Sequence, residues 1–228
     1  MSEYRDRDHI KSYVKRATRM SAHQRRAYEQ LYHRYCVERT ESPIDPGTLF
    51  PDPDRPVVLE IGFGMGRATA ELASSMRDVN FLGVEVYKPG VGKLLSRIDE
   101  NGLTNVRIIH DDAILVLERM IPDSSLEGIC LFFPDPWPKK RHHKRRIVRP
   151  ALTAVMARRI RPGGYVYMVT DWDDYALAAM DILDTTPGLR NEYDGFAPPL
   201  QWRPRTAFEE KGRQASRPIR ELYYLRAM

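Results

Sequence analysis

The sequence predicts an α/β fold in which a parallel sheet carries helices on both faces. Short apolar segments rich in β-branched residues alternate with segments of helical pattern, an order typical of repeated strand–helix units. Pro and Gly residues stand where helices are expected to begin or end. The chain has 228 residues and is 42% hydrophobic, which suffices for one large core. We therefore expect one α/β domain with additional segments.

The expected elements follow one another regularly from residue 57 onward. Strands are predicted at residues 57–61, 80–86, 106–112, 127–133 and 165–172. Helices are predicted at residues 67–76, 89–101, 147–160 and 174–184, with a short helix ending near Met120. Pro-Gly-Gly at residues 162–164 is expected to stop the chain before the fifth strand. A last strand at residues 221–228 is expected to pair antiparallel at the sheet edge.

The N-terminal segment differs in composition from the rest of the chain. Residues 1 to about 40 are polar and helix-prone, and Ser21 is the expected N-cap of a helix over residues 22–35. Residues 41–56 contain five prolines and one glycine, a composition typical of a linker. We therefore expect a basic helical arm with a Pro-rich linker at residues 1–50 and the main domain at residues 51–228.

Charge is distributed unevenly, although the formal net charge is only +5. Residues 50–130 contain eight Lys or Arg and thirteen Asp or Glu, whereas residues 139–149 contain seven Lys or Arg, two His and no acid. The first 26 residues hold eight Lys or Arg against three acids. An acidic middle with basic flanks favours a domain that binds a cationic or neutral small molecule and meets a polyanion at its rim. Solvated charged faces are the alternative.

The remaining composition excludes several classes of protein. Cys36, on an expected helix, and Cys130, in an expected core strand, indicate a reduced protein without a disulfide framework. The six histidines show no metal-ligand spacing, so no metal site is expected. The charged N-terminus and the lack of a long apolar run predict a cytoplasmic protein without membrane contact. Because no long apolar seam is visible, a monomer or a weak homodimer is expected.

Acidic residues stand at or near the end of every expected parallel strand. They are Glu60, Glu85, Asp112, Asp135 and Asp171. Carboxylates gathered at one sheet edge repel one another and cost solvation, so stability alone does not explain them, although one or two could cap helices. Ligands of such sheets bind beyond the carboxyl ends of the strands, where the strand order reverses. We therefore place the active site at this edge.

The first strand-to-helix turn reads LEIGFGMGRA and places Gly62, Gly64 and Gly66 after Glu60. Glycine permits a tight turn and the close approach of a ligand. A dinucleotide fingerprint would need glycine where Arg67 stands, and a pyrophosphate would not favour Glu60. The pattern E-x-G-x-G-x-G is typical of S-adenosylmethionine-dependent methyltransferases, which bind a sulfonium amino acid. A nicotinamide enzyme is the less favoured alternative.

Two further acids suit the rest of such a cofactor. Glu85, at the end of the second strand, is placed to hold a ribose diol through both carboxylate oxygens. Asp112, at the end of the third strand, is placed to accept a hydrogen bond from an adenine amino group. These positions predict S-adenosyl-L-methionine as the cofactor.

Residues 132–146, FFPDPWPKKRHHKRR, join the fourth strand to the densest run of positive charge. Pro134 and Pro136 restrict the backbone around Asp135 and hold its carboxylate on a stiff turn. Trp137 offers an aromatic face for packing a base, or is a core tryptophan of a rigid loop. The cations that follow would hold the phosphates around that base. The motif therefore predicts an RNA-binding lip beside the cofactor site.

Together the segments LEIGFGMG, GVEVYKPGV, FFPDPWPKKRHHKRRIV, VTDW and RPRTAFEEKG resemble the tRNA (guanine-N7-)-methyltransferase family of bacteria. The resemblance runs from about residue 57 to the C-terminus. It implies a class I, Rossmann-like methyltransferase fold with a mostly parallel, seven-stranded sheet. It further implies that the substrate is the guanine at position 46 in the variable loop of tRNA.

The resemblance also implies roles for individual residues. Asp135 corresponds to the proposed catalytic residue of the family. The cofactor-contacting acids correspond to Glu60, Glu85, Asp112 and Asp135, beside Gly62, Gly64 and Gly66 of the turn. The substrate-contacting positions correspond to Lys139, Asp171, Thr206, Ala207, Phe208 and Glu209. The basic stretch of the family corresponds to Arg141, Lys144, Arg145 and Arg146.

The chemistry of guanine N7 limits what the protein must supply. N7 has an in-plane lone pair and no proton, so no general base is needed, and the methylated base gains positive charge. Catalysis should therefore come from positioning and from a nearby anion, for which Asp135 is the candidate. Asp135 either accepts hydrogen bonds from the guanine or positions the methionine end of the cofactor. Asp171 and Glu209 are candidates for another guanine contact, unless Asp171 caps the helix at 174–184.

Alternatives remain for the function and for two segments. The enzyme could methylate another RNA base or an exocyclic amine, and a non-catalytic RNA-binding module is a third class. The arginine-rich tail is expected to carry residues 206–209 over the active site, with a solvated surface loop as the alternative. Residues 11–26 are expected to contact RNA.

Overall fold

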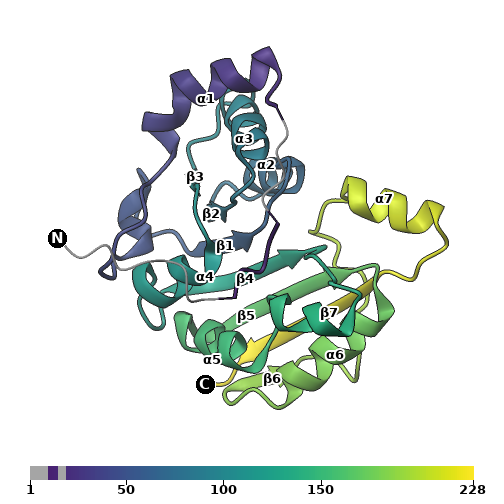
Figure 1. Cartoon of the computed structure of the whole chain (residues 1–228). Coiled ribbons are helices and arrows are strands. Elements are labelled where there is room, and N and C mark those ends of the chain that lie inside the picture. The colour runs from purple at the N-terminus through teal and green to yellow at the C-terminus, as the bar shows by residue number, and fades with distance from the viewer. Residues whose placement is uncertain (1–9, 15–18) are drawn as a thin grey trace.

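The computed structural model describes residues 10–14 and 19–228, so part of the expected RNA-contacting arm at residues 11–26 lies outside the described residues. One sheet runs through the molecule, with helices on both of its faces (Figure 1). The strands are β1 (Val57–Ile61), β2 (Asn80–Val84), β3 (Val106–Ile109), β4 (Leu126–Phe132), β5 (Ile160–Thr170), β6 (Leu189–Asn191) and β7 (Arg220–Arg226). The longer helices are α1 (Ala22–Tyr35), α2 (Arg67–Ser75), α3 (Lys88–Glu100), α5 (Pro150–Arg159), α6 (Asp173–Asp184) and α7 (Ala207–Gln214). Shorter helical turns are η1 (Pro46–Leu49), α4 (Ala113–Leu115), η2 (Val116–Met120) and η3 (Lys140–Arg145).

The seven strands lie in the order β3-β2-β1-β4-β5-β7-β6. Strands β1 to β5 are mutually parallel, and β7 is antiparallel to both β5 and β6. The order reverses at β1, because β2 and β3 extend the sheet on one side of it and β4 and β5 extend it on the other. The expected ligand crevice therefore lies at the carboxyl ends of β1 and β4.

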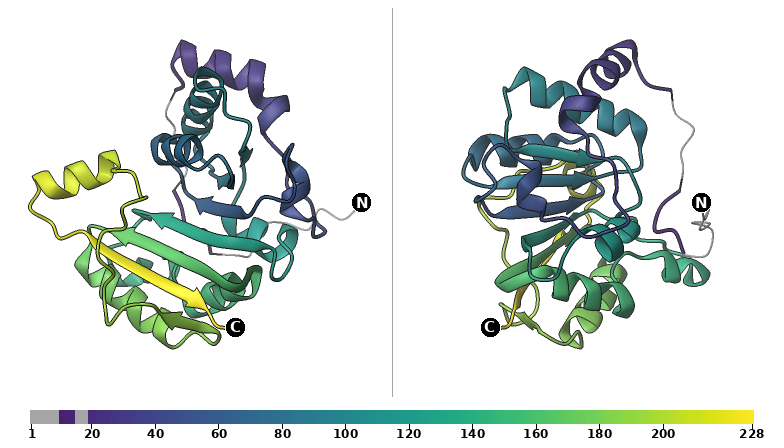
Figure 2. Two further views of the ribbon diagram at one scale, coloured as in Figure 1. Left: turned by 180° about the vertical axis from the view of Figure 1, so that it is seen from behind. Right: turned by 90° about the vertical axis from the view of Figure 1, so that its left-hand side faces the viewer.

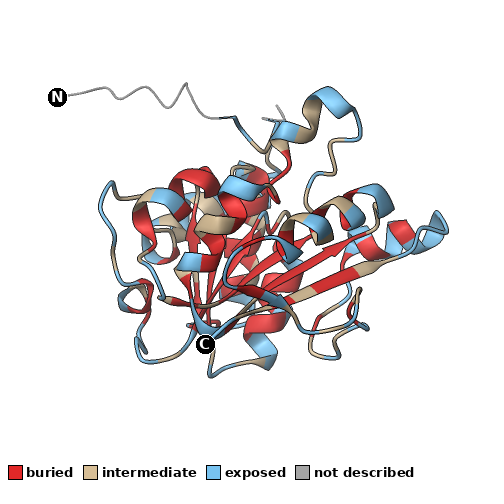
Figure 3. Ribbon diagram, turned by 90° about the horizontal axis from the view of Figure 1, so that it is seen from below, coloured by how far each residue is buried: buried red, intermediate tan, exposed pale blue. Residues whose placement is uncertain are grey.

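Each face of the sheet forms its own apolar layer, because successive strand residues point to opposite faces. In β4, Ile129 and Leu131 face a core completed by α4, α5 and α6, whereas Cys130 and Phe132 face the core under α2 and α3. Two further views show the layers (Figure 2), and the buried residues concentrate along the strands and the inner sides of the helices (Figure 3). The burial of Cys130 confirms its expected place in the core.

Helix α1 starts at the expected residue and packs on the main domain. The Ser21 hydroxyl accepts the Gln24 N–H at 3.2 Å while the Gln24 side chain accepts the Ser21 N–H at 2.8 Å, forming a capping box. Ala27 and Tyr35 are buried, and a Cβ added to Gly92 of α3 would lie 2.6 Å from the Gln24 carbonyl oxygen. Residues 22–35 thus share a core with the strands of the main domain.

The expected linker is also packed against the domain. Asp45 caps η1 by accepting the N–H of Gly47 at 3.0 Å. Phe50 follows this turn and is buried in the core beneath α5 and α6. The Pro-rich segment therefore follows a fixed path into β1. Among the described residues, no helix is both long and apolar enough to cross a membrane.

Four details differ from the sequence-based predictions. Pro-Gly-Gly at 162–164 does not stop the chain, because β5 begins at Ile160, which pairs with Leu126 before a register shift absorbs these residues. Strand β7 is not the edge strand, because the three-residue β6, which the pattern did not predict, pairs along its outer side. Residues 207–214 form a helix where only a connecting segment was expected. Cys36 lies just beyond α1 and forms an isolated bridge with Ile108.

Candidate active site

The turn after β1 has a backbone that glycine adopts most easily. The φ angles of Gly62, Gly64 and Gly66 are 75°, 57° and 67°, in the left-handed region. A Cβ added to Gly66 would lie 2.6 Å from the Cβ of Leu94 on α3. A Cβ added to Gly90 of α3 would lie 2.0 Å from the Gly64 carbonyl oxygen. The turn therefore depends on close contact with α3, and Gly90 is a requirement that sequence reasoning missed.

Glu85, directly after β2, stabilises this turn through hydrogen bonds to backbone N–H groups. Its Oε2 accepts the Gly64 N–H at 2.9 Å. Its Oε1 accepts the N–H groups of Val86 and Tyr87 at 2.8 and 2.9 Å. Burial raises the pKa of Glu85, the three backbone N–H groups oppose this rise, and the charge of Asp135 adds to it. The carboxylates that follow β2 and β4 are thus close enough to interact electrostatically.

Two further acids stand buried at the same edge. Glu60 in β1 is 2% exposed, and its Oε2 accepts the Thr69 hydroxyl at 2.7 Å. Burial raises the pKa of Glu60 to about 7, the Thr69 hydrogen bond opposes the rise, and the charge of Glu85 adds to it. Asp112, after β3, accepts the Ile114 N–H at 2.9 Å and so caps α4. Asp112 therefore lies at the edge of the site and is also one of the acids that cap a helix, as the structural alternative allowed.

Asp135 lies on a turn with two unusual backbone conformations. Phe133 and Trp137, two residues to either side of it, have φ angles of 53° and 45°. Side chains make this region costly by about 1–3 kcal/mol for each residue, and such conformations concentrate at functional sites. The Phe133 N–H donates to the Val169 carbonyl at 2.7 Å, so the turn starts directly from the pairing of β4 with β5. Asp135 itself is exposed at the carboxyl edge of the sheet.

The cations that follow the turn differ in their exposure. Lys139 and Arg141 are exposed. The Arg145 guanidinium lies over the Trp137 ring, 4.9 Å from its centroid, which is a favourable cation–π distance. The Trp137 indole N–H donates to the Ser12 carbonyl at 3.2 Å. Trp137 is therefore half-buried with one face covered, rather than a core tryptophan or a fully open platform.

Arg146 differs from the other cations of this stretch because it is buried, with 4% exposure. Its Nε donates to the Pro136 carbonyl at 2.9 Å, and its Nη2 donates to Asp174 of α6 at 2.7 Å. The guanidinium also lies over the Tyr175 ring, 4.6 Å from the centroid. Although Arg146 belongs to the run that resembles an RNA-binding stretch, it ties the Asp135 turn to α6.

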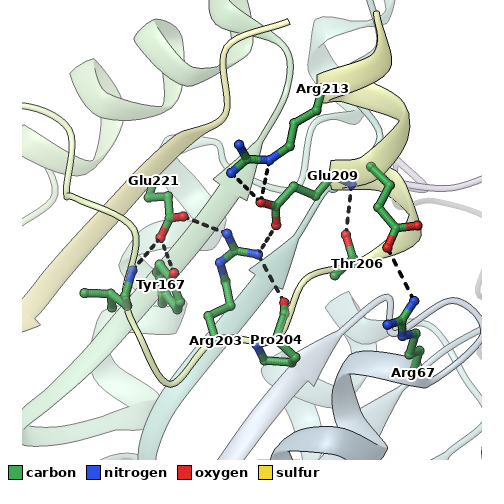
Figure 4. Close-up of polar contacts among 10 residues, drawn as sticks. Arg67, Tyr167, Arg203, Pro204, Thr206, Glu209, Arg213 and Glu221 are labelled. Atoms are coloured by element: carbon green, nitrogen blue, oxygen red, sulfur yellow. Dashed lines mark hydrogen bonds and ion pairs between the residues drawn. The ribbon is translucent and has the colours of Figure 1, made fainter. Parts of the chain in front are cut away.

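Helix α7 brings the C-terminal part of the chain to the same edge. It lies beyond the carboxyl ends of β4 and β5 (Figure 1). Phe208, which is 57% exposed, stacks on Phe133 of the Asp135 turn with ring centroids 6.3 Å apart and an interplanar angle of 20°. Glu210 pairs with Arg67 at the start of α2 at 3.6 Å (Figure 4). Helix α7 thus connects the Asp135 turn to the glycine turn.

Asp171, directly after β5, lies under α7. A Cβ added to Gly212 would lie 2.9 Å from the Cβ of Asp171. Arg217 donates to the Asp171 carboxylate at 2.9 Å. Trp172, not Asp171, is the N-cap of α6, so the helix-cap alternative for Asp171 is wrong. The structure therefore brings Asp171 next to α7, the helix in which residues 207–209 lie.

The segment at residues 206–209 has a specific local structure. The Thr206 hydroxyl accepts the Glu209 N–H at 3.1 Å and caps α7, and Ala207 is exposed in the first turn. The Glu209 side chain is only 1% exposed and faces away from solvent. Arg203 and Arg213 donate to its two oxygens at 2.7 and 2.8 Å. The guanine contact of Glu209 remains a prediction, and Arg203 is a residue that sequence reasoning missed.

Nothing in the described part of the chain resembles a metal centre. Within residues 10–14 and 19–228, no group of three or more His, Cys, Asp or Glu side chains could hold a metal ion. The acids of the site are held by backbone N–H groups, a hydroxyl group and arginines. Their arrangement suits a cationic organic ligand.

Comparison with known proteins finds one matching family model and several similar proteins. Residues 54–222 match a family described as putative methyltransferase. A tRNA (guanine-N(7)-)-methyltransferase of Paracidovorax citrulli (strain AAC00-1) is 46% identical over 217 residues, which cover 95% of this chain and 87% of that protein. A tRNA (guanine-N(7)-)-methyltransferase of Nitrosomonas eutropha (strain DSM 101675 / C91 / Nm57) is 44% identical over 218 residues, covering 96% of this chain and 97% of that protein.

Solved structures support the fold at much lower sequence identity. An rRNA methylase from Streptococcus thermophilus is 16% identical, with a TM-score of 0.52 over 77% of this chain and 89% of that chain. An aminoglycoside resistance methyltransferase is 18% identical, with a TM-score of 0.52 over 76% of this chain and 88% of that chain. These likenesses confirm the expected class I, Rossmann-like methyltransferase fold with its mostly parallel, seven-stranded sheet.

Proposed function

Because the chain belongs to the tRNA (guanine-N(7)-)-methyltransferase family, we propose that it methylates N7 of the guanine at position 46 in the variable loop of tRNA. The methyl donor in this proposal is S-adenosyl-L-methionine. The general activity, methyl transfer to N7 of a tRNA guanine, follows from the family. The position of the guanine, the donor and the roles of individual residues are parts of the proposal.

The residues around the glycine turn fit a donor that carries positive charge. A Cβ added to Gly62 or Gly64 would meet no atom within 4 Å, so the backbone of the turn borders open space. Burial raises the pKa of both Glu60 and Glu85, and a cationic ligand would favour their ionised forms. In the proposal the donor is held by Glu60, Gly62, Gly64, Gly66, Glu85, Asp112 and Asp135. When bound, S-adenosyl-L-methionine supplies an electrophilic methyl group on a sulfonium ion.

The chain's own residues must then place the guanine and stabilise the charge that it gains. Asp135 lies on a stiff turn at the strand end next to the glycine turn, and its carboxylate is the anion proposed to face the charging base. Phe208 presents an exposed ring at the same edge and is proposed to pack against the base. Asp171, Thr206, Ala207 and Glu209 complete the proposed substrate contacts.

Binding of the tRNA backbone is assigned to cations beside this edge. Lys139 and Arg141 are exposed directly after the Asp135 turn, and Arg145 covers one face of Trp137. Positive side chains placed next to the reacting base would fix the register of the phosphates around it. We also propose that residues 1–50 support RNA binding and that residues 51–228 carry out methyl transfer, although α1 packs against α3 of the catalytic part.

The observation that supports the proposal most directly is the arrangement at the β1–β4 boundary. There, where the strand order reverses, the acid-lined glycine turn and the Asp135 turn leave neighbouring parallel strands, and α7 contacts both through Arg67 and Phe133. A donor site and an acceptor site on adjacent strand ends suit a direct transfer between two bound molecules.

The proposal can be tested with purified protein, a tRNA transcript and donor labelled in the methyl group. Borohydride followed by aniline cleaves RNA at N7-methylguanine, so the modified position can be mapped. We expect one cleavage site, at position 46, which disappears in a transcript with adenine at that position. Label incorporated at another guanine would refute the positional proposal, and label in an exocyclic amine would refute N7 chemistry.

A further inference from the structure

A buried ionic network connects α7 to the sheet (Figure 4). Arg203 donates from Nη1 to Glu209 of α7 at 2.7 Å and from Nη2 to Glu221 of β7 at 2.8 Å. The side chains of these three residues are between 1% and 3% exposed. Tyr167 of β5 donates its hydroxyl proton to the other oxygen of Glu221. One guanidinium therefore bridges α7 and β7 directly and is linked to β5 through Glu221.

The charges of this network are balanced only through a residue at its surface. The buried part holds two carboxylates and one guanidinium. Arg213, whose side chain is 54% exposed, supplies the second positive charge by donating from Nε and Nη2 to Glu209 Oε1 at 3.0 and 2.8 Å. Burial opposes ionisation of Glu209, but Arg203 and Arg213 outweigh it and hold its pKa below the usual value. Glu209 is therefore ionised and held at both of its oxygens.

Two other side-chain contacts of α7 are exposed to solvent. The Arg67–Glu210 pair is exposed and spans 3.6 Å, and an exposed pair contributes little to stability. Phe208 is more than half exposed in its stack on Phe133. Arg203 thus supplies the buried contact that connects α7 to the sheet.

We infer that Arg203 is a positioning residue for the methyl transfer, because its two-carboxylate bridge holds residues 206–209 over the ends of β4 and β5. This inference rests on the proposed function, in which those residues contact the guanine. Arg203 itself is enclosed and does not reach the substrate; it acts through α7. Lysine would replace it only in part, because an ammonium group keeps the charge but lacks the planar fork that arginine directs at two carboxylates.

The first test compares Arg203→Met with the wild-type protein in two measurements. Hydrogen exchange should show loss of amide protection in residues 207–214, with protection of β1 and β4 retained. In steady-state methylation of tRNA, kcat should fall about 10²-fold, since a displacement of about 1 Å has this effect on positioned groups. The affinity for S-adenosyl-L-methionine should stay unchanged. For Arg203→Lys, the amide protection of residues 207–214 and the kcat should lie between those of Arg203→Met and those of the wild type.

A second variant separates positioning from stability, because Arg203→Met leaves two buried carboxylates without their partner. Arg203→Met/Glu221→Gln removes both charges of one bridge and leaves the Glu209–Arg213 pair neutral. We expect this variant to regain most of the lost thermal stability while its kcat stays low. Arg190→Met makes the same change at an exposed arginine of β6, outside the network. Its thermal stability, kcat and amide protection of α7 should match those of the wild type.

Each outcome bears on a different statement. Wild-type protection of α7 and wild-type kcat in the folded double variant would overturn the inference while leaving the proposed function intact. If the double variant recovers kcat together with thermal stability, Arg203 is structural only, and the inference is overturned as well. A wild-type protein that does not methylate tRNA guanine would instead refute the proposed function, and with it the role of Arg203 in transfer.

Discussion

The two halves of the sheet's carboxyl edge are built in different ways. On the side of β1, β2 and β3, the acids lie in the strands or directly after them, and their partners are near in sequence or belong to the backbone. Glu60 bonds to a hydroxyl nine residues away, and Glu85 accepts three backbone N–H groups. On the side of β4, β5 and β7, long connections are held by buried arginines, namely Arg146 on Asp174 and Arg203 on Glu221.

The two halves thus position their functional side chains by different means. Strand ends of a parallel sheet are positioned by the backbone ladder, so acids attached to them need little further support. The connections after β4 and before β7 have no such ladder and depend on buried side-chain bridges to neighbouring elements. We therefore expect changes in the first half to act on donor binding or on stability, and changes in the second half to act on kcat.

The largest effect is expected at Asp135, where the two halves meet. Asp135→Asn should lower kcat about 10²–10³-fold, because the neutral amide cannot stabilise the positive charge that the guanine gains. Single-turnover methylation and calorimetric titration of the donor should be measured together. Asp123→Asn, an exposed acid before the amino end of β4, is the matched control. If donor affinity falls and the transfer rate does not, Asp135 belongs to donor binding alone.

A second prediction concerns the pH dependence of stability in the first half. Since burial raises the pKa of Glu60 from 4.5 to about 7, the protonated form stabilises the folded state, and this contribution is complete below about pH 4.5 and lost as pH rises through 7. The loss should amount to about 3 kcal/mol. Urea unfolding of the wild type and of Glu60→Gln at pH 5 and pH 8 isolates it, because glutamine keeps an acceptor for Thr69.

Binding of the donor should also depend on the protonation state of Glu60. A cationic donor should favour the ionised carboxylate, so S-adenosyl-L-methionine should bind more tightly to the wild type at pH 8 than at pH 6. The affinity of Glu60→Gln should depend less on pH. Identical pH profiles for the two proteins, in unfolding and in donor binding, would mean that Glu60 keeps one protonation state throughout this range.

The third prediction concerns Arg146 in the second half. Arg146→Met should lower kcat by up to about 10²-fold and leave the KM for tRNA nearly unchanged, because the buried guanidinium positions the Asp135 turn instead of binding RNA. Steady-state kinetics at a temperature where the variant is folded would measure both constants. A rise in KM with kcat unchanged would identify Arg146 as a phosphate contact after all.

The smallest effect is expected at the exposed cations beside that turn. Arg141→Met should raise the KM for tRNA a fewfold and lower the slope of log affinity against log salt by about one, since one phosphate contact is removed. Binding titrations between low and moderate salt would measure the slope. Arg161→Met, at an exposed arginine near the amino end of β5, should change neither quantity.

The organisation of the donor half could be predicted from local sequence. The strand at 57–61, the strand predicted at 80–86 and observed at 80–84, the turn with its three glycines and the acids near the strand ends follow from apolar runs, φ requirements and spacing. These signals extend over only a few residues. Pro-Gly-Gly at 162–164 misled the same reasoning, because those residues usually end an element but here are absorbed within β5 by a register shift.

The sequence by itself thus determined the parallel sheet, the edge on which the acids gather and, through resemblance, the family. Only the tertiary structure decided which of many arginines are internal. Arg145 and Arg146 are neighbours with the same chemistry, yet one lies on Trp137 and the other is buried on Asp174. Arg203 has an exposed arginine two positions later and is distinguished only by Glu209 and Glu221. The reason is physical: the partners that make these buried charges tolerable, Asp174, Glu209 and Glu221, lie on helices or strands outside the segments that carry Arg146 and Arg203, and come near only when the chain folds.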